Sequence, residues 1–314
     1  MSLIVEHLTK KYGEKTVVDD LSFAMQDHGV YALLGTNGAG KTTSIRMMLG
    51  MLAKDAGTVL WNGKPLDINT CNVGYLAEER GLYPKYSLMD QLMYFAGLRG
   101  VSKADAKQRI RYWAERLDAT EYLYPTIEPG KKGKAKPKLA DQLSKGNQQK
   151  IQFMIALISD PERLILDEPL SGLDPVNTDL FKEIIREEID RGKYVIMSSH
   201  QMATVEEFCT DITIMNKSRA IVQGHLADIK KSWGRVNLNL KTESDITGLL
   251  ETSGARLLSR KENEYKLKVS GEAEANRLLG TLIDAGVTVI TFDLREPSLH
   301  EIFVEKVGEA NEAE

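Results

Sequence analysis

Short apolar runs alternate with amphipathic stretches through the first 225 residues of the chain. Residues 30–34, 164–166 and 194–197 are apolar runs of strand length, and polar residues follow each of them. After the first run, apolar side chains recur at helical spacing, namely Ile45, Met48, Leu49 and Leu52. Strands that alternate with helices and end in polar residues are typical of a mainly parallel sheet covered by helices. We therefore predict an α/β fold for this part of the chain.

The same pattern predicts further strands and a helical insertion. Residues 3–9 and 16–24 alternate like two strands around a turn. From about 84 to 150 the spacing becomes helical, and Ser87 and Ser102 begin capping boxes. Further short strands are predicted at residues 59–61 and 72–76. A helical subdomain, residues 84–150, is thus expected within the sheet-containing domain.

Beyond residue 225 the pattern changes to strict alternation of apolar and polar residues, which indicates strands with one exposed face. The expected strands are residues 236–240, 265–269 and 287–292, and the expected helices are 244–252 and 272–285. We predict two domains, residues 1–225 and 226–314, the second being a small α+β domain. The acidic residues 309–314 are expected to form a frayed tail.

Composition narrows the class of protein. The apolar content of 42% and the charged content of 27% are ordinary for a soluble protein, and a net charge of −4 creates no field that would gather nucleic acid. No apolar run approaches the length of about 18 residues that spans a membrane, and the first residues lack the features of a signal peptide. Cys71 and Cys209 stand alone, which argues against a disulfide framework. We expect a cytosolic protein that binds no nucleic acid.

A glycine-rich loop after the first apolar run carries the strongest chemical signal. It fits G-x-x-x-x-G-K-[ST], in which backbone N–H groups surround the phosphates of a nucleotide. Its glycines permit a close approach of the backbone to the phosphates, and the following helix adds its positive dipole end. Lys41 is expected to reach the β- and γ-phosphates, and Thr42 to ligate Mg²⁺. The candidate nucleotide-binding residues are Gly35, Thr36, Asn37, Gly38, Ala39, Gly40, Lys41, Thr42 and Thr43.

Two carboxylates, Asp167 and Glu168, stand at the end of the apolar run 164–166. A phosphate-loop hydrolase needs carboxylates there, because one holds Mg²⁺ and the other can orient and deprotonate an attacking water. A carboxylate pair after a strand can instead cap a helix. The accompanying Lys41 favours the catalytic interpretation. We assign Asp167 to the metal and Glu168 to the water.

With these motifs in place, the chain resembles the ATP-binding cassette ATPases. Residues 143–149, Leu-Ser-Lys-Gly-Asn-Gln-Gln, are similar to the family signature L-S-G-G-Q, with Lys145 in place of the first glycine. This motif separates the family from other phosphate-loop proteins. Residues 171–174, Ser-Gly-Leu-Asp, are similar to the family's D-loop.

Two single residues complete the resemblance, which covers residues 2–225 in the family's order. His200, after an apolar run, is similar to the switch histidine. For a lone tyrosine beside a turn, packing is the more common role, but Tyr12 falls where the family stacks an aromatic ring on adenine, and the resemblance favours that role. The resemblance implies ATP hydrolysis with ATP and Mg²⁺ as cofactors, and Lys41, Glu168 and His200 as catalytic residues.

The resemblance also implies partners. Two cassettes, most simply two copies of this chain, would face each other head to tail. Ser144 and Gly146 of one copy would then contact the γ-phosphate held by the other, and Asp174 would lie at the same nucleotide. The helical segment 84–150 would dock against a permease, which must be a separate integral membrane chain. The protein would therefore lie in the cytoplasm, peripheral to the inner face of the cell membrane.

One departure points to a subgroup. Glu78 stands where the family usually has a glutamine that touches Mg²⁺ and links the site to the permease, and a carboxylate can still ligate Mg²⁺. Residues 78–83 resemble a subgroup of bacterial export cassettes, and residues 297–303 resemble an accessory domain of the same proteins. We therefore expect an exporter subunit, and Glu78 joins Thr42 and Asp167 as a candidate metal ligand.

The alternative is a soluble cassette that acts on ribosomes or nucleic acid. A lysine-rich segment, residues 131–138, is its only support, and a solvated loop or a contact with anionic lipid explains that segment too. Soluble translation cassettes usually carry two motif sets, and repair cassettes carry long coiled coils. This chain has one set and no sustained heptads, which favours the exporter. The transported substrate is not encoded in these motifs.

Overall fold

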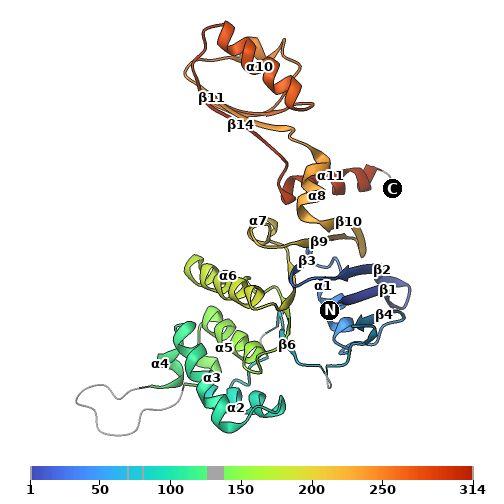
Figure 1. Cartoon of the computed structure of the whole chain (residues 1–314), viewed down its shortest axis with the longest axis vertical. Coiled ribbons are helices and arrows are strands. Elements are labelled where there is room, and N and C mark those ends of the chain that lie inside the picture. Colours follow the sequence, from blue (N-terminus) through green and yellow to red (C-terminus); the bar gives the residue numbers. More distant parts are fainter. Residues whose placement is uncertain (1, 69–70, 80, 126–137, 313–314) are drawn as a thin grey trace, which may run out of the picture. The chain divides into compact units, whose positions relative to one another are not determined.

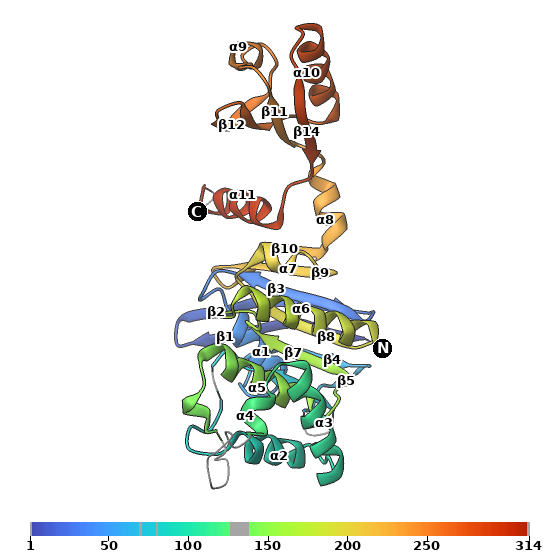
Figure 2. The same cartoon turned by 90° about the vertical axis from the view of Figure 1, so that its left-hand side faces the viewer.

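The computed structural model describes residues 2–68, 71–79, 81–125 and 138–312 (Figures 1 and 2). The chain divides into two units, residues 1–201 with 208–222 and residues 202–207 with 223–314. Apart from Lys138, the lysine-rich segment 131–138 lies outside the described residues, as does Arg80.

Six strands form a sheet that contains the predicted parallel core. They are β3 (Gly29–Gly35), β6 (Val73–Leu76), β7 (Arg163–Asp167), β8 (Tyr194–Ser199), β9 (Asp211–Asn216) and β10 (Arg219–His225). Their order is β10-β9-β3-β8-β7-β6. β3 pairs in parallel with β8 and β9, and β7 pairs in parallel with β8 and β6. Every residue of β3 is buried, as expected for a parallel strand covered on both faces.

A second, antiparallel sheet lies in the same unit. Its strands are β1 (Leu3–Tyr12), β2 (Lys15–Met25), β4 (Ala56–Trp61) and β5 (Lys64–Pro65), in the order β2-β1-β4-β5. Helix α1 (Lys41–Met48) shares one core with both sheets, since Leu8, Leu21, Leu33, Ile45 and Met48 belong to a single buried cluster. The strands expected near residues 3–9 and 16–24 are present. Their arrangement as a separate sheet was not part of the sequence prediction.

The predicted helical segment is present. It consists of α2 (Leu88–Leu98), α3 (Lys103–Arg116), α4 (Thr120–Leu123), the 3₁₀ turn η1 (Ala140–Gln142) and α5 (Lys145–Leu157). The expected capping serines are confirmed, because Ser87 accepts from the N–H of Asp90 at 3.1 Å and Ser102 accepts from that of Asp105 at 3.2 Å. The helical region continues beyond residue 150, to Leu157.

Helix α5 rests directly on strand β6. A Cβ atom at Gly74 of β6 would lie 2.2 Å from the carbonyl oxygen of Ala156 in α5. No side chain fits in that space, so the absence of one at Gly74 is a requirement of the packing. The backbone of α5 therefore lies directly against the backbone of β6 at this residue.

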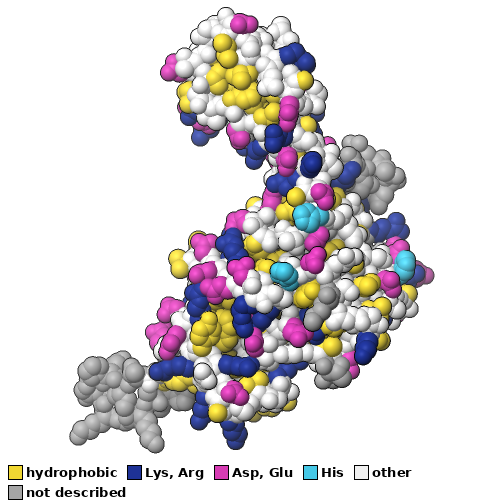
Figure 3. Space-filling model, in the orientation of Figure 1, with side chains coloured by type: hydrophobic (Ala, Val, Ile, Leu, Met, Phe, Trp, Pro, Cys, Tyr) yellow, Lys and Arg dark blue, Asp and Glu magenta, His cyan; other side chains and the backbone are white. Residues whose placement is uncertain are grey.

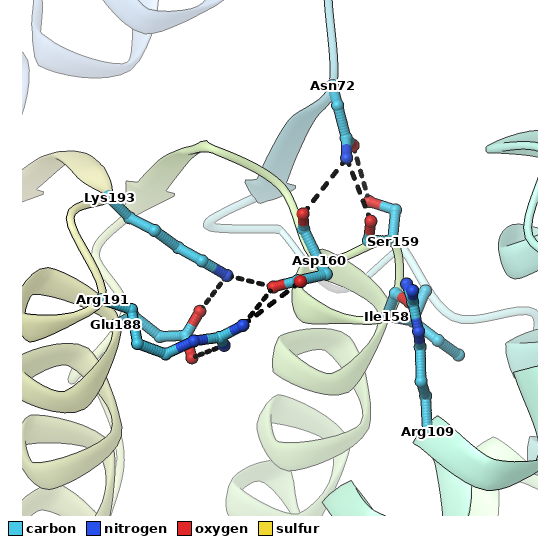
Figure 4. A network of polar contacts seen from close by, with 8 residues as sticks. All are labelled: Asn72, Arg109, Ile158, Ser159, Asp160, Glu188, Arg191 and Lys193. Carbon is cyan, nitrogen blue, oxygen red and sulfur yellow. Dashed lines mark hydrogen bonds and ion pairs between the residues drawn. The ribbon is translucent and has the colours of Figure 1, made fainter. Parts of the chain in front are cut away.

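Polar contacts from three other segments hold the turn between α5 and β7 (Figure 4). Asn72, just before β6, donates to the carbonyl oxygens of two turn residues at 3.0 and 3.3 Å, and Arg109 of α3 donates at 2.8 Å to the carbonyl oxygen of Ile158, the residue that follows α5. The carboxylate of Asp160 accepts from Lys193 at 2.6 Å and from Arg191 at 3.0 Å. The far end of α5 is therefore fixed to β6, α3 and the start of β8.

Helix α6 (Pro175–Asp190) begins with Pro175, as predicted. Near its end, the side chain of Glu188 is 3% exposed and is ion-paired with Arg191 and Lys193. This buried carboxylate joins α6 to the network around Asp160.

The second unit holds a four-stranded antiparallel sheet in the order β12-β13-β11-β14. Its elements are α7 (Met202–Val205), α8 (Leu226–Trp233), β11 (Asn237–Thr242), α9 (Thr247–Leu250), β12 (Arg256–Lys261), β13 (Glu264–Lys268), α10 (Glu272–Asp284), β14 (Val289–Arg295) and α11 (Leu299–Glu312). Alternate strand residues such as Leu240, Tyr265 and Leu267 pack with Leu278 and Leu282 of α10. The predicted α+β arrangement with one exposed sheet face is confirmed.

Two expectations for this region were wrong. The tail predicted from residue 309 continues α11 as far as Glu312, because extending an existing helix needs no new nucleus and Glu and Ala are good helix formers. The helix expected over 244–252 is only the single turn α9, since Asp245 instead accepts from the N–H and the hydroxyl of Thr247 in a local turn.

Candidate nucleotide and catalytic site

The glycine-rich loop lies between β3 and α1, in the strand–loop–helix order that a phosphate loop requires. Gly40 caps the helix with φ +106°, a conformation that L side chains rarely adopt. A Cβ atom there would also lie 2.5 Å from the carbonyl oxygen of Val17. Both the backbone conformation and the space therefore demand glycine at this position.

Lys41 is curled back into the loop. Its ammonium donates to the carbonyl oxygens of Gly35 at 2.9 Å and Thr36 at 3.2 Å, and lies 3.3 Å from Oε1 of Glu168. Only 6% of the side chain is exposed. It borders a cavity of about 150 Å³ that is lined by Val17, Asn37, Gly38, Gly40, Lys41, Thr42, Thr43, Glu78 and Glu168. A cation at the wall of a cavity surrounded by loop backbone suits a phosphate chain.

Thr42, Glu78 and Asp167 meet in three dimensions. The hydroxyl of Thr42 lies 3.1 Å from Oδ1 of Asp167 and 3.2 Å from Oε2 of Glu78. A hydroxyl has one proton, so it can donate fully to only one of these carboxylates. The other oxygen, Oδ2 of Asp167, is buried and has no hydrogen-bond partner among the described residues. An unpaired buried carboxylate oxygen beside a hydroxyl and a second carboxylate is a set of hard oxygen ligands that fits Mg²⁺.

Electrostatics agree with this fit. Burial raises the pKa of Asp167 and the negative charges of Glu78 and Glu168 raise it further, whereas hydrogen bonds from Ser198 and Thr42 lower it. A bound divalent cation would offset the burial and the repulsion. The described residues include no group of three or more His, Cys, Asp or Glu placed to hold a metal, so phosphates and water would supply the remaining ligands.

Glu168 lies between two basic groups. Its Oε2 atom is 2.9 Å from Nδ1 of His200 and 3.4 Å from the backbone N–H of the same residue, and Oε1 faces Lys41. The side chain is 6% exposed, whereas that of His200 is 40% exposed. A carboxylate held this way, at the mouth of a phosphate-sized cavity, can accept a proton from water.

The signature and the D-loop lie elsewhere. Ser144 caps α5 by accepting from the N–H of Asn147 at 3.3 Å, and Asp174 caps α6 by accepting from that of Asn177 at 3.0 Å, which lowers the pKa of Asp174. A Cβ atom at Gly146 would lie 3.7 Å from the side chain of Leu173. In the part of the chain that the structure describes, no hydrogen bond or ion pair joins these residues to the phosphate loop.

Tyr12 ends β1 and is 54% exposed, with the ammonium of Lys10 at 5.3 Å from its ring centroid. Its ring is accessible for stacking. Ser198, in contrast, carries no motif and was given no role from the sequence. Its hydroxyl is buried between the two carboxylate residues, and the only signal was a polar residue at the end of an apolar run.

Comparison with known proteins connects this geometry to a family. The family described as ABC transporter matches residues 18–171, and the family of the DrrA1-3-like ATP-binding protein C-terminal domain matches residues 224–307. An uncharacterized ABC transporter ATP-binding protein of Bacillus subtilis, YhaQ, is 41% identical over 98% of both chains.

Two further similarities extend the comparison. The Nod factor export ATP-binding protein I of Paraburkholderia xenovorans is 33% identical, over 70% of this chain and 69% of its own length. A solved structure of an ATP-binding subunit of an ABC transporter superposes with a TM-score of 0.64 at 27% identity, over 74% of this chain and 93% of that one. Within the residues described, no helix is long and apolar enough to cross a bilayer.

Proposed function

The chain belongs to the ATP-binding proteins of ABC transporters, which hydrolyse ATP to power transport, and we propose that it drives an exporter through a separate membrane permease. The observation that carries the proposal is that Lys41, Thr42 and Glu168 line one cavity. Asp167 and His200 contact Thr42 and Glu168 directly. Direction of transport is supported by the relative that is named a Nod factor export protein.

In the proposed mechanism, the N–H groups of the phosphate loop and the Lys41 ammonium bind the β- and γ-phosphates. Lys41 gives up its contacts with the loop carbonyls to do so. Thr42, Asp167 and Glu78 would hold Mg²⁺, which when bound neutralises phosphate charge. Phosphoryl transfer then needs mainly positioning and a group that receives the proton of the attacking water.

Glu168 is the proposed general base. Its carboxylate takes the proton, and His200 holds that carboxylate from the solvent side through Nδ1. Tyr12 is proposed to stack on the adenine ring. Oδ2 of Asp167 and Oε1 of Glu168 are both buried without a hydrogen bond among the described residues, but Oε1 faces the Lys41 ammonium at 3.3 Å, which supports a metal on Asp167 rather than on Glu168.

A second copy of the chain would complete the site. Among the described residues, Ser144, Gly146 and Asp174 make no polar contact with the phosphate loop of their own chain, which leaves them available to the nucleotide of a partner. We propose a homodimer of cassettes with ATP between them. The helix dipole at the start of α5 would add to binding of the γ-phosphate.

The permease is proposed to dock in a groove of about 770 Å³ beside β6, the strand that precedes Glu78. It is lined by Ile68, Cys71, Asn72, Val73, Gly74, Tyr75, Phe95, Leu98, Arg99, Gly100, Ile155 and Ser159. Leu98 at its rim is 63% exposed, an apolar side chain of the kind that protein interfaces cover. Docking here would place the protein at the inner face of the membrane.

We further propose a domain boundary between residues 225 and 226, with regulation or dimer support as the role of the C-terminal domain. The match of its own family from residue 224 supports the boundary. The soluble alternative, acting on ribosomes or nucleic acid, has no comparable support. The named relatives are transport proteins, and on the face in Figure 3 positive and negative side chains are interspersed.

Co-purification from membranes tests the proposal. Tagged chain expressed with its permease should be recovered in the membrane fraction, and an integral membrane protein should elute with it from detergent extracts. Leu98→Glu places a charge at the groove rim and is expected to abolish co-elution while ATP hydrolysis persists. Recovery on ribosomes or DNA without any integral membrane protein would overturn the exporter assignment.

A further inference from the structure

Ser198 is fully buried and stands between the two strands that carry the chemistry. On β8 it is paired with Leu33 of β3, just before the phosphate loop, and with Asp167 of β7. Its hydroxyl donates to Oδ1 of Asp167 at 2.5 Å and accepts from the backbone N–H of Glu168 at 2.9 Å. A single side chain thus contacts both candidate functional carboxylate residues.

The two hydrogen bonds of the Ser198 hydroxyl fix the direction of its proton. Because its oxygen accepts from an amide, its one proton is directed to Asp167. Oδ1 of Asp167 thus accepts from Ser198 and lies 3.1 Å from the hydroxyl of Thr42, whereas Oδ2 has no hydrogen-bond partner among the described residues and is left for a ligand. The bond from Ser198 therefore restricts rotation of the Asp167 carboxylate.

The hydrogen bond from the N–H of Glu168 to Ser198 stabilises a strained backbone conformation at Glu168. Glu168 has φ +50°, in the left-handed region that L residues with long side chains seldom occupy. That conformation aims the side chain at Lys41 and His200 instead of along the strand. Without Ser198, the N–H of Glu168 would be buried without a partner, and the conformation would lose the bond that holds it.

We propose that Ser198 is a positioning residue for hydrolysis, which sets the orientation of Asp167 and holds Glu168 in its reactive conformation. The inference rests on the proposed function, because it assumes that these two carboxylates act on ATP. It assigns to Ser198 an effect on turnover rather than on nucleotide binding. Mutation of a residue that holds a ligand-binding side chain in place typically lowers activity about 10–100-fold.

The experiment uses the full chain and compares Ser198→Ala with Ser199→Ala. Ser199 is the adjacent buried serine, but among the described residues its hydroxyl has a single hydrogen bond, from the N–H of Gln201 at 2.9 Å. We expect Ser198→Ala to lower kcat about 10–100-fold, with binding of a fluorescent ATP analogue in EDTA changed less than about threefold. Ser199→Ala should keep normal turnover, and Ser198→Thr, which retains the hydroxyl, should recover most of the lost kcat.

A double-variant cycle separates positioning from simple structural damage. If Ser198 acts through Glu168, adding Ser198→Ala to Glu168→Gln should cost little further turnover, since coupled residues are not additive. Equal losses in both backgrounds, or normal kcat for Ser198→Ala, would overturn the inference. If Ser198→Ala does not fold, Ser198→Cys can be used in the same test. Its side chain is similar in size to serine, but the thiol is only a weak hydrogen-bond donor and acceptor. A fully active Glu168→Gln protein would instead refute the proposed role of Glu168 as the general base.

Discussion

Glu168→Gln is the sharpest test of the catalytic assignment. The amide keeps the shape of the carboxylate and can still bond His200 Nδ1, but it cannot accept a proton from water. Loss of a general base costs about 10²–10⁴-fold, which corresponds to about 2.7–5.4 kcal/mol of activation free energy. ATP affinity should not fall, because the variant also frees Lys41 from the carboxylate now 3.3 Å away. The variant should therefore bind ATP, hydrolyse it very slowly and remain in the closed dimer.

Phosphate release under saturating ATP measures the rate, and light scattering after size exclusion measures the mass with and without ATP. Lys41→Ala is the matched control, because it removes the phosphate ligand and should show neither ATP binding nor a doubled mass. The reasoning is refuted if Glu168→Gln hydrolyses ATP at the unmodified rate and its mass is the same with and without nucleotide.

Three further predictions follow from the fold and the site. Glu78→Ala should lower permease-stimulated ATPase activity more than ATP affinity, whereas the exposed Glu79→Ala should alter neither; full stimulation of the first variant would show that the position is idle. Lys193→Met strips the buried Glu188 of one partner and should destabilise the chain by about 3 kcal/mol, lowering the melting temperature by about 6–12 °C. Adding Glu188→Leu should restore most of that loss, and equal melting of all three proteins would contradict it. A chain truncated before Leu226 should still bind ATP in a filter assay; a folded truncation that does not bind would place the boundary elsewhere.

The elements that sequence reasoning located are those whose signals are local. Ser87 and Ser102 cap helices through bonds three residues away, and the run before Asp167 is buried on both faces whatever its neighbours are. The strand β12, however, is exposed along its whole length, so its residues carry no apolar alternation to detect. The separate antiparallel sheet depends on pairing β1 with β4, about 50 residues apart, and periodicity assigns a face to a strand but no partner.

The residues of the candidate site likewise differ in whether a local sequence signal identifies them. Lys41 and Thr42 were recognisable because a contiguous motif fixes both their type and their setting. That Thr42 lies within 3.2 Å of Glu78 depends on the placement of β6 at the sheet edge, 36 residues along the chain. Ser198 belongs to no motif, and its role follows only from the register of β8 between β3 and β7.

Gly74 has a mechanical consequence. With no side chain between β6 and α5 there is no compressible layer at their contact, so the helix cannot tilt or slide there unless the strand moves too. Glu78 follows the end of that strand, and Ser144 caps the opposite end of a 13-residue helix about 20 Å long. We therefore expect a displacement of β6 to move α5, and with it the Ser144 end of that helix, because the two backbones are in direct contact at Gly74.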